Sequence, residues 1–447
     1  MTLSTTSEKI NAQGGLVLVG QLFKKALRLP SLIKGRVGNQ KFSDLDIVQT
    51  AIGLLVQGRK HFSDAETFRQ EKSEVLKYAL GLNAIPSEAT FRQRITKMAK
   101  TTAMMDTLRQ ANQNLLKTVS PSSIKVGEEL YIPNDIDATP MNNEGSSREE
   151  VSYTYKGFEG YTPVMSNLGS EGYMLHHELR PGRQHSQKDT PEFLADNFEY
   201  LKELNLKHKV LVRMDSGFDS GDTIEVLRNS GYDFIVKRNL RRENKVKFLS
   251  HAKAQGGPDK SEREGEEVYY GTIEHCVPGG EDSTQEPLTC AYKITERSID
   301  KEGYALCINE LEVDLYWTSL GVEAQEVVRL YQDHATSEQF HSELKSDMGI
   351  ERFPSHSFMV NELFLMLGVL AYNVLRVIDA EVMQHVEAWP DFYRKRGQRQ
   401  QRRRVGSIIR DFILVASKVV KHAGRVTIKL TTSWPWTRVM QKVSLNL

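Results

Sequence analysis

The sequence predicts an α/β protein in which a mixed β-sheet is flanked by helices. Between residues 121 and 239, apolar strand-like segments alternate with helical ones, and this order is typical of a sheet that contains parallel strands. Before residue 120 and after residue 320, apolar residues recur at helical spacing instead. With 447 residues the chain is too long for one ordinary core, so several structural units are expected.

Residues 1–120 are predicted to form a helical DNA-binding domain. Segments Asp44–Leu55 and Ser63–Tyr78 carry apolar residues at helical spacing, and their first residues serve as caps. A further helix is capped by Ser87 and carries basic residues behind the cap. Units of this kind dock on DNA in helix-turn-helix proteins. A plain helical bundle is an equally good interpretation.

Residues 121–239 are predicted to form the first part of the sheet-containing core. The expected strands are Glu129–Thr139, Tyr153–Phe158, Gly172–Leu179, Lys209–Met214 and Tyr232–Lys237. The expected helices are Thr190–Leu204 and Ser220–Ser230, the second capped by Ser220 or Asp222.

The composition changes between residues 240 and 312, which are rich in Gly, Glu and Lys. This stretch is predicted to be a β-rich insertion with short strands at Val268–Ile273, Leu288–Thr295 and Tyr304–Asn309. Residues 313–380 then return to the core, with a strand at Leu315–Leu320 and a long helix at Glu323–Met348.

A second helix in this part, Leu363–Val377, is apolar. Its uninterrupted apolar stretch, Leu363–Tyr372, is about half the ~20 residues that a bilayer span needs. We therefore expect a buried helix and no membrane association.

Residues 381–447 are predicted to be a basic helical region that contacts DNA or a second copy of the chain. From residue 391 onward there are 14 Lys and Arg residues against two acidic ones, Asp391 and Asp411, although the whole chain has a net charge of only +1. Such a local excess marks contact with a polyanion. Arg402, Arg403 and Arg404 are the predicted phosphate contacts in its densest part. A solvated helix face or a disordered tail is the alternative.

The three cysteines, Cys276, Cys290 and Cys307, are odd in number and widely spaced. They offer neither a disulfide framework nor paired zinc-ligand spacing, so a reducing cytoplasm is the expected location.

Two aspartates lie near the ends of predicted strands. Asp137 shares one strand face with Asp135, because side chains alternate with a period of two. Asp215 ends an apolar strand, and in open α/β sheets ligands gather at the carboxyl ends of strands. A turn-forming or helix-capping role is the alternative for Asp215.

The helix that begins at Glu323 carries a stripe of polar residues on one face. At ~100° per residue, this stripe consists of Tyr331, His334, Glu338, His341 and Lys345. Glu343 falls on another face, so Glu338 is the predicted metal-binding glutamate. A solvent-facing helix rich in charge pairs is the alternative.

Three carboxylates from three segments suit hard divalent cations, Mg²⁺ or Mn²⁺. Two such ions per site activate a water or a 3′-hydroxyl and stabilise the leaving oxygen during phosphodiester displacement. Lys345 and His334 are predicted to hold the DNA backbone, and Tyr331 to position it.

With these segments the chain resembles bacterial insertion-sequence transposases of the DDE class, whose core is RNase H-like. One subgroup carries the signature Tyr-x2-Arg-x3-Glu-x6-Lys. The chain matches it at Tyr331, Glu338 and Lys345, while His334 replaces the arginine. The segments Asp135-Ile136-Asp137-Ala138-Thr139 and Val212-Arg213-Met214-Asp215-Ser216-Gly217-Phe218 resemble the two aspartate strands of that family.

The resemblance implies a catalytic and metal-binding triad of Asp137, Asp215 and Glu338, with Asp135 as the rival for first place. It also implies a homodimer that binds terminal inverted repeats, cleaves the element ends and joins 3′-hydroxyls to target double-stranded DNA. Histidine cannot fork onto a phosphate as arginine does, so His334 predicts weaker phosphate contact or an impaired copy. Two other functions remain open: an inactive DNA-binding protein on the same scaffold, and a nuclease without strand transfer.

Overall fold

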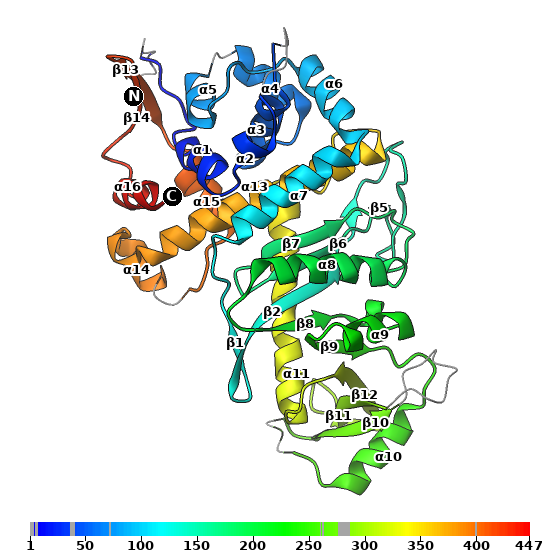
Figure 1. Cartoon of the computed structure of the whole chain (residues 1–447). Helices are drawn as coiled ribbons and strands as arrows, with labels where there is room; N and C mark the ends of the chain where they lie inside the picture. Colours follow the sequence, from blue (N-terminus) through cyan, green and yellow to red (C-terminus); the bar gives the residue numbers. More distant parts are fainter. Residues whose placement is uncertain are drawn as a thin grey trace.

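The computed structural model describes residue 4 and residues 8–35, 41–70, 73–259, 261, 263–275, 287–397 and 400–447. The chain begins with a helical unit that lies on one side of the long helix α13 (Figure 1). Its helices are α1 (Leu16–Lys25), α2 (Leu29–Leu32), α3 (Asp44–Leu55), α4 (Phe62–Gln70), α5 (Glu74–Leu80), α6 (Glu88–Ala99) and α7 (Thr102–Leu116).

Local sequence signals account for most of these helix boundaries. Helix α3 has the predicted bounds, but its cap is Ser43, which forms a reciprocal capping box with Asp46. The helix predicted over Ser63–Tyr78 is two helices, since α4 ends at Gln70 and Ser73 caps α5. Ser87 caps α6 as predicted.

One mixed sheet forms the centre of the molecule. Its strands are β1 (Ile124–Val126), β2 (Glu129–Ala138), β6 (Val164–Leu168), β7 (Tyr173–Glu178), β8 (Lys209–Met214), β9 (Asp233–Arg238), β10 (Glu266–His275), β11 (Leu288–Ile299) and β12 (Ala305–Thr318). The order is β10-β11-β12-β9-β8-β2-β6-β7, with β1 beside β2. Strands β2, β8 and β9 are parallel, and β6 and β7 are antiparallel to their neighbours.

Helices cover this sheet, which confirms the predicted fold class and is consistent with an RNase H-like core. Helix α8 (Thr190–Leu204) connects β7 to β8, and α9 (Gly221–Asn229) connects β8 to β9. Both start at positions that the sequence indicated, and Ser220 caps α9. Helix α11 (Ala324–Gln332) packs on β9, β10, β11 and β12.

The predicted β-rich insertion does not form a sheet of its own. Strands β10, β11 and β12 extend the central sheet by pairing with β9, and α10 (Lys245–Gln255) packs against them. The strands predicted at Tyr304–Asn309 and Leu315–Leu320 are one continuous strand, β12. The boundary expected at residue 312 therefore falls inside β12 and is wrong.

The strand predicted over Tyr153–Phe158 is also wrong. The chain turns there between β4 (Ser152–Tyr153) and β5 (Glu159–Tyr161), which form a small sheet with β3 (Met141–Asn142). Gly157 has a φ of 86°, a left-handed conformation that glycine adopts without strain. Gly157 therefore marks a turn and not an extended strand.

The apolar helix α13 (Phe358–Gln384) runs through the core, as predicted, and is longer than the sequence indicated. It is long and apolar enough to cross a membrane, yet 94% of its most apolar window is buried inside the protein. Its Asn373 reaches the edge strand β7, where its side-chain amide binds both backbone groups of Met174. Asn112 of α7 binds the same amide and the same carbonyl.

The C-terminal region is less helical than predicted. It contains α14 (Asp391–Gly397), α15 (Val405–Ile408), a π-helical turn (Ile409–Ile413) and α16 (Thr437–Asn446). Between them, β13 (Ser417–His422) and β14 (Arg425–Leu430) form a two-stranded ribbon. Helix propensity did not predict this ribbon, whose strands are rich in valine and basic residues.

Asn373→Leu is expected to lower the free energy of unfolding by about 3 kcal/mol, because the N–H and C=O of Met174 lose buried partners. Urea denaturation measures this change. Gln384→Leu, at an exposed position of the same helix, should change the free energy by less than about 0.5 kcal/mol. Equal effects of both substitutions would show that the amide does not hold the sheet edge.

Candidate active site

The three predicted carboxylates line one cleft of about 680 Å³ at the carboxyl ends of the parallel strands. Asp137 lies near the end of β2, and Asp215 directly follows β8. The parallel register pairs Ile136 with Met214. Asp137 and Asp215 are the next residues along the two neighbouring segments, so they lie side by side. Glu338 enters from α12 (Ser337–Ser342).

Asp137 is largely buried beside another carboxylate, Asp215. Burial and then the nearby charge of Asp215 raise the pKa of Asp137 to about 7, with a smaller contribution from Glu338. The negative charges of Asp215 and Glu338 thus disfavour the ionised form of Asp137.

Asp215 has two roles. It caps a short 3₁₀ turn (Ser216–Phe218), where its Oδ1 accepts a hydrogen bond of 3.0 Å from the N–H of Gly217. Burial raises the pKa of the Asp215 carboxyl, although the bond from Gly217 opposes this shift. The turn-forming alternative is therefore correct for one oxygen, while the side chain still lines the cleft.

Asp135, the rival of Asp137, does not line the cleft. Its two oxygens accept hydrogen bonds of 2.6 and 2.8 Å from the guanidinium of Arg213, and it is 2% exposed. Burial would raise the pKa of Asp135, but Arg213 and His334 outweigh it and lower the pKa to about 2. Asp135 is thus an internal counter-ion.

His334 is the third member of this buried ion cluster. Its Nδ1 lies 3.0 Å from Oδ1 of Asp135 and its side chain is 7% exposed. Burial lowers the pKa of His334, yet Asp135 reverses the shift and raises it above the ordinary value. The side chain borders the cleft, but its nitrogen already has an internal partner. That His334 contacts phosphate stays a prediction.

Sequence reasoning missed Arg213. It is 2% exposed, pairs with Asp135, and donates a 2.6 Å hydrogen bond from Nη1 to the carbonyl of Leu330 at the end of α11. An arginine in the middle of an apolar strand was the available signal, because a buried guanidinium requires a buried carboxylate.

The predicted stripe is present, since all five of its members line the cleft. The helix that carries it is not continuous. After α11 the chain makes a 3₁₀ turn (Asp333–Thr336), then α12, then a π-helical turn (Glu343–Asp347). Such irregular turns are frequent at functional sites.

Neutral and basic groups surround the carboxylates. Burial, followed by Lys345 and His334, lowers the pKa of His341 to about 3, and its Nδ1 lies 3.6 Å from Oδ2 of Asp137. Lys345 donates a 3.3 Å hydrogen bond to the carbonyl of Pro140, and burial lowers its pKa. Lys156 also lines the cleft, a position that the sequence did not single out.

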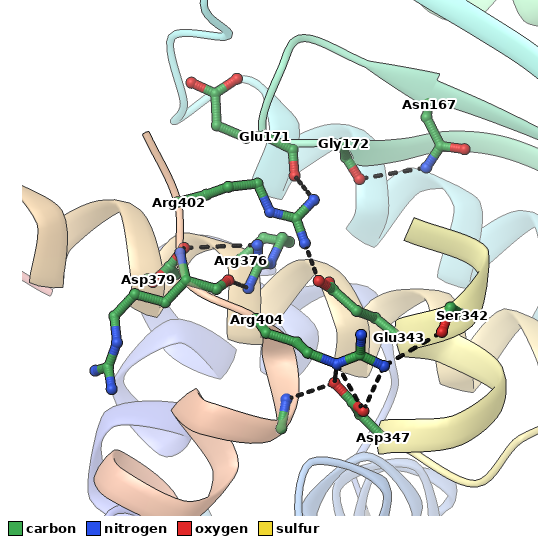
Figure 2. Close-up of polar contacts among 12 residues, drawn as sticks. Asn167, Glu171, Gly172, Ser342, Glu343, Asp347, Arg376, Asp379, Arg402 and Arg404 are labelled. Atoms are coloured by element: carbon green, nitrogen blue, oxygen red, sulfur yellow. Dashed lines mark hydrogen bonds and ion pairs between the residues drawn. The ribbon is translucent and has the colours of Figure 1, made fainter. Parts of the chain in front are cut away.

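Arg402, Arg403 and Arg404 lie outside the cleft and bind carboxylates of the chain itself. Figure 2 shows Arg402 joined to Glu343 and to the carbonyl of Glu171, and Arg404 joined to Asp347. Arg403 is 7% exposed and pairs with Asp411. All three side chains have internal partners, and that they contact phosphate stays a prediction.

These arginines stabilise the segment that follows Glu338. Glu343 is fully buried and faces away from the cleft, as predicted, and its partner Arg402 is only 11% exposed. Asp347 accepts bonds from Arg404 and from the N–H of Gly406. The C-terminal region thus holds the π-helical turn on which Lys345 stands (Figure 2).

The donor set of the cleft suits a hard divalent cation. Among the residues that the structure describes, no three His, Cys, Asp or Glu side chains form a ready-made group that could hold a metal ion. Mg²⁺ usually takes one or two carboxylates and keeps several waters, so three carboxylates around one cleft provide enough ligands. A bound cation would also neutralise the repulsion between Asp137 and Asp215.

Comparisons with known proteins give one family. The family model described as "Transposase DDE domain group 1" matches residues 1–447. No curated protein sequence matches significantly. Among solved structures, the chain is similar to piggyBac transposase in a synaptic complex with hairpin DNA, at 12% identity and a TM-score of 0.45, over 90% of this chain and 79% of that chain.

Arg402→Met is expected to lower the free energy of unfolding by about 3 kcal/mol, because the buried Glu343 loses its charged partner. Urea denaturation measures this loss. Arg410→Met removes an exposed arginine from another ion pair and should change the free energy by no more than about 1 kcal/mol. If Arg402→Met left stability intact but weakened DNA binding, the arginine would belong to the DNA interface after all.

Proposed function

Because this chain belongs to the Transposase DDE domain group 1 family, we propose that it cleaves DNA at the ends of its own element and joins the 3′-hydroxyls to target DNA. The observation that carries the proposal is that Asp137, Asp215 and Glu338, from three separate segments, line one cleft. The family match supports transposition, and the cleft supports phosphodiester chemistry.

Each side chain has a proposed role. Asp137, Asp215 and Glu338 would hold Mg²⁺ or Mn²⁺, which supplies activation of the attacking hydroxyl and neutralisation of the leaving oxygen. Lys345 and Lys156 border the same cleft and would bind the DNA backbone beside the scissile bond. Tyr331, whose pKa is raised by burial and by Asp215, stays neutral and would position the backbone.

We propose that His341 stays a neutral neighbour of Asp137. Its Nδ1 lies 3.6 Å from that carboxylate, and its low pKa keeps it from competing with a cation for the negative charge. The substrates would be the terminal inverted repeats and target duplex, bound by two copies of the chain that bridge the two ends.

Glu338→Gln is expected to reduce cleavage and strand transfer at least about a hundredfold, the size typical of losing a charge-stabilising group, while DNA binding persists. Linear DNA that bears the element's flanking repeat is the substrate, and denaturing gels resolve cut and joined products. Asp333→Asn is the matched control, because Asp333 is an exposed acid near Glu338 that does not line the cleft. Equal loss in both variants would contradict the role of Glu338.

Removing divalent metal with EDTA should abolish cleavage and leave binding to the repeat unchanged, because the carboxylates and not the DNA-binding surfaces need the cation. Gel-shift and cleavage assays on the same DNA separate the two effects. Binding without cutting in Mg²⁺ would indicate an inactive DNA-binding protein. Cut ends that are never joined would indicate a nuclease.

A further inference from the structure

The ribbon formed by β13 and β14 is basic along its whole length. Between residues 417 and 430 the chain has no acidic residue, and the basic ones are Lys418, Lys421, His422, Arg425 and Lys429. Ala423 and Gly424 join the strands with φ values of 46° and 75°, which is the tight turn that matches the twist of a hairpin. The ribbon lies at the periphery, beside α5 (Figure 1).

The strand register gathers basic side chains on one face of the ribbon. Lys418 lies opposite Lys429, and His422 lies opposite Arg425. Since side chains alternate, these two pairs share a face. Like charges directly opposite one another destabilise an antiparallel pair. The repulsion between these side chains destabilises the ribbon in the free protein, and a bound anion would relieve it.

The other face anchors the ribbon to the body. Ser417 pairs with Asn11 in an isolated bridge, and its side chain and that of Leu430 pack against Gly14. Lys421, near the tip, binds Glu74 at 2.6 Å and lies 4.9 Å from the ring centre of Tyr78. The ribbon is thus held against α5 with its basic face outward.

Two cations of this face have no counter-ion among the residues that the structure describes. Lys418 is paired with Glu8 at 3.1 Å. Arg425 and Lys429 are exposed, and neither forms an ion pair with any residue that the structure describes. They differ in this respect from the arginines at 402–404, which are paired internally.

A second group of cations lies on the helical unit, beside the ribbon face that carries Lys421. A hollow of about 380 Å³ is lined by Lys41, Arg69 and Lys77 together with Glu74 and Tyr78. The last two residues also contact Lys421 of the ribbon. Cations from the first and last parts of the sequence therefore border one another.

We infer that the ribbon face carrying Arg425 and Lys429 is a binding site for double-stranded DNA, separate from the catalytic cleft. The inference rests on the proposed function, which requires the chain to hold duplex DNA. The major groove admits a two-stranded β-ribbon, and phosphates on its rims neutralise the facing cations. Binding removes the repulsion between Lys418 and Lys429.

The test compares Arg425→Gln/Lys429→Gln with wild type in the full chain. Fluorescence anisotropy with a labelled 30-base-pair duplex of mixed sequence gives the dependence of log Kd on log salt. Each lost phosphate contact lowers that slope by about 0.9, so the double variant is expected to lose up to about 1.8. Lys207→Gln/Lys301→Gln, at exposed positions in other loops, should retain the wild-type slope.

Thermal unfolding of the free protein provides a second measurement. The ribbon variant should be at least as stable as wild type, because Lys429→Gln removes the repulsion with Lys418. A wild-type slope in the ribbon variant, or a slope shared with the control variant, would overturn the inference.

The inference and the proposed function fail in different ways. If wild type cuts the repeat but the ribbon variant keeps its salt slope, only the ribbon site is wrong. If wild type binds no duplex at any salt concentration, both are wrong.

Discussion

The buried ion cluster of Asp135, Arg213 and His334 is the constraint on which the active-site geometry depends. Arg213 bridges the first two parallel strands of the core and also binds the carbonyl of Leu330, so it fixes the end of α11 against both strands. Each member is followed along its own segment by one cleft carboxylate. Asp137 comes two residues after Asp135, Asp215 two after Arg213, and Glu338 four after His334. The ion pairs of the buried cluster therefore fix the positions of the three carboxylates that line the cleft.

This arrangement gives the histidine at position 334 a structural explanation. Asp135 already has a guanidinium from Arg213 on both oxygens. A second arginine, as in the family pattern, would add a permanent charge to a site that burial disfavours. The imidazole of His334 pairs with the same carboxylate, is smaller than a guanidinium, and unlike arginine can lose its proton. The departure from the pattern is thus compatible with an intact site, and by itself it is no sign of lost catalysis.

Segments whose ends are set by neighbouring residues were predictable from the sequence. Asp44–Leu55, Thr190–Leu204 and Lys209–Met214 have the predicted bounds, because the pattern of apolar residues within each segment sets them. Strand β12 was divided wrongly, because its continuity depends on pairing with β11 and β9, which lie elsewhere in the chain. The cleft was predictable as a set of residues, since strand ends and one helical stripe define it. The ion cluster was not, because Arg213 and Asp135 meet only through the parallel register.

The charge of the C-terminal region is a second case in which contacts between distant residues could not be predicted from the sequence. A sequence gives the number of cations, but not how many are neutralised inside the fold. Burial of Glu343 and Asp411 requires nearby cations, and Arg402 and Arg403 satisfy them. Arg402 and Arg403 are thereby neutralised inside the fold. Arg425 and Lys429, by contrast, lie on strands with no acid opposite. A polyanion site is therefore better identified by which cations lack an ion pair in the folded chain than by the density of cations along the sequence.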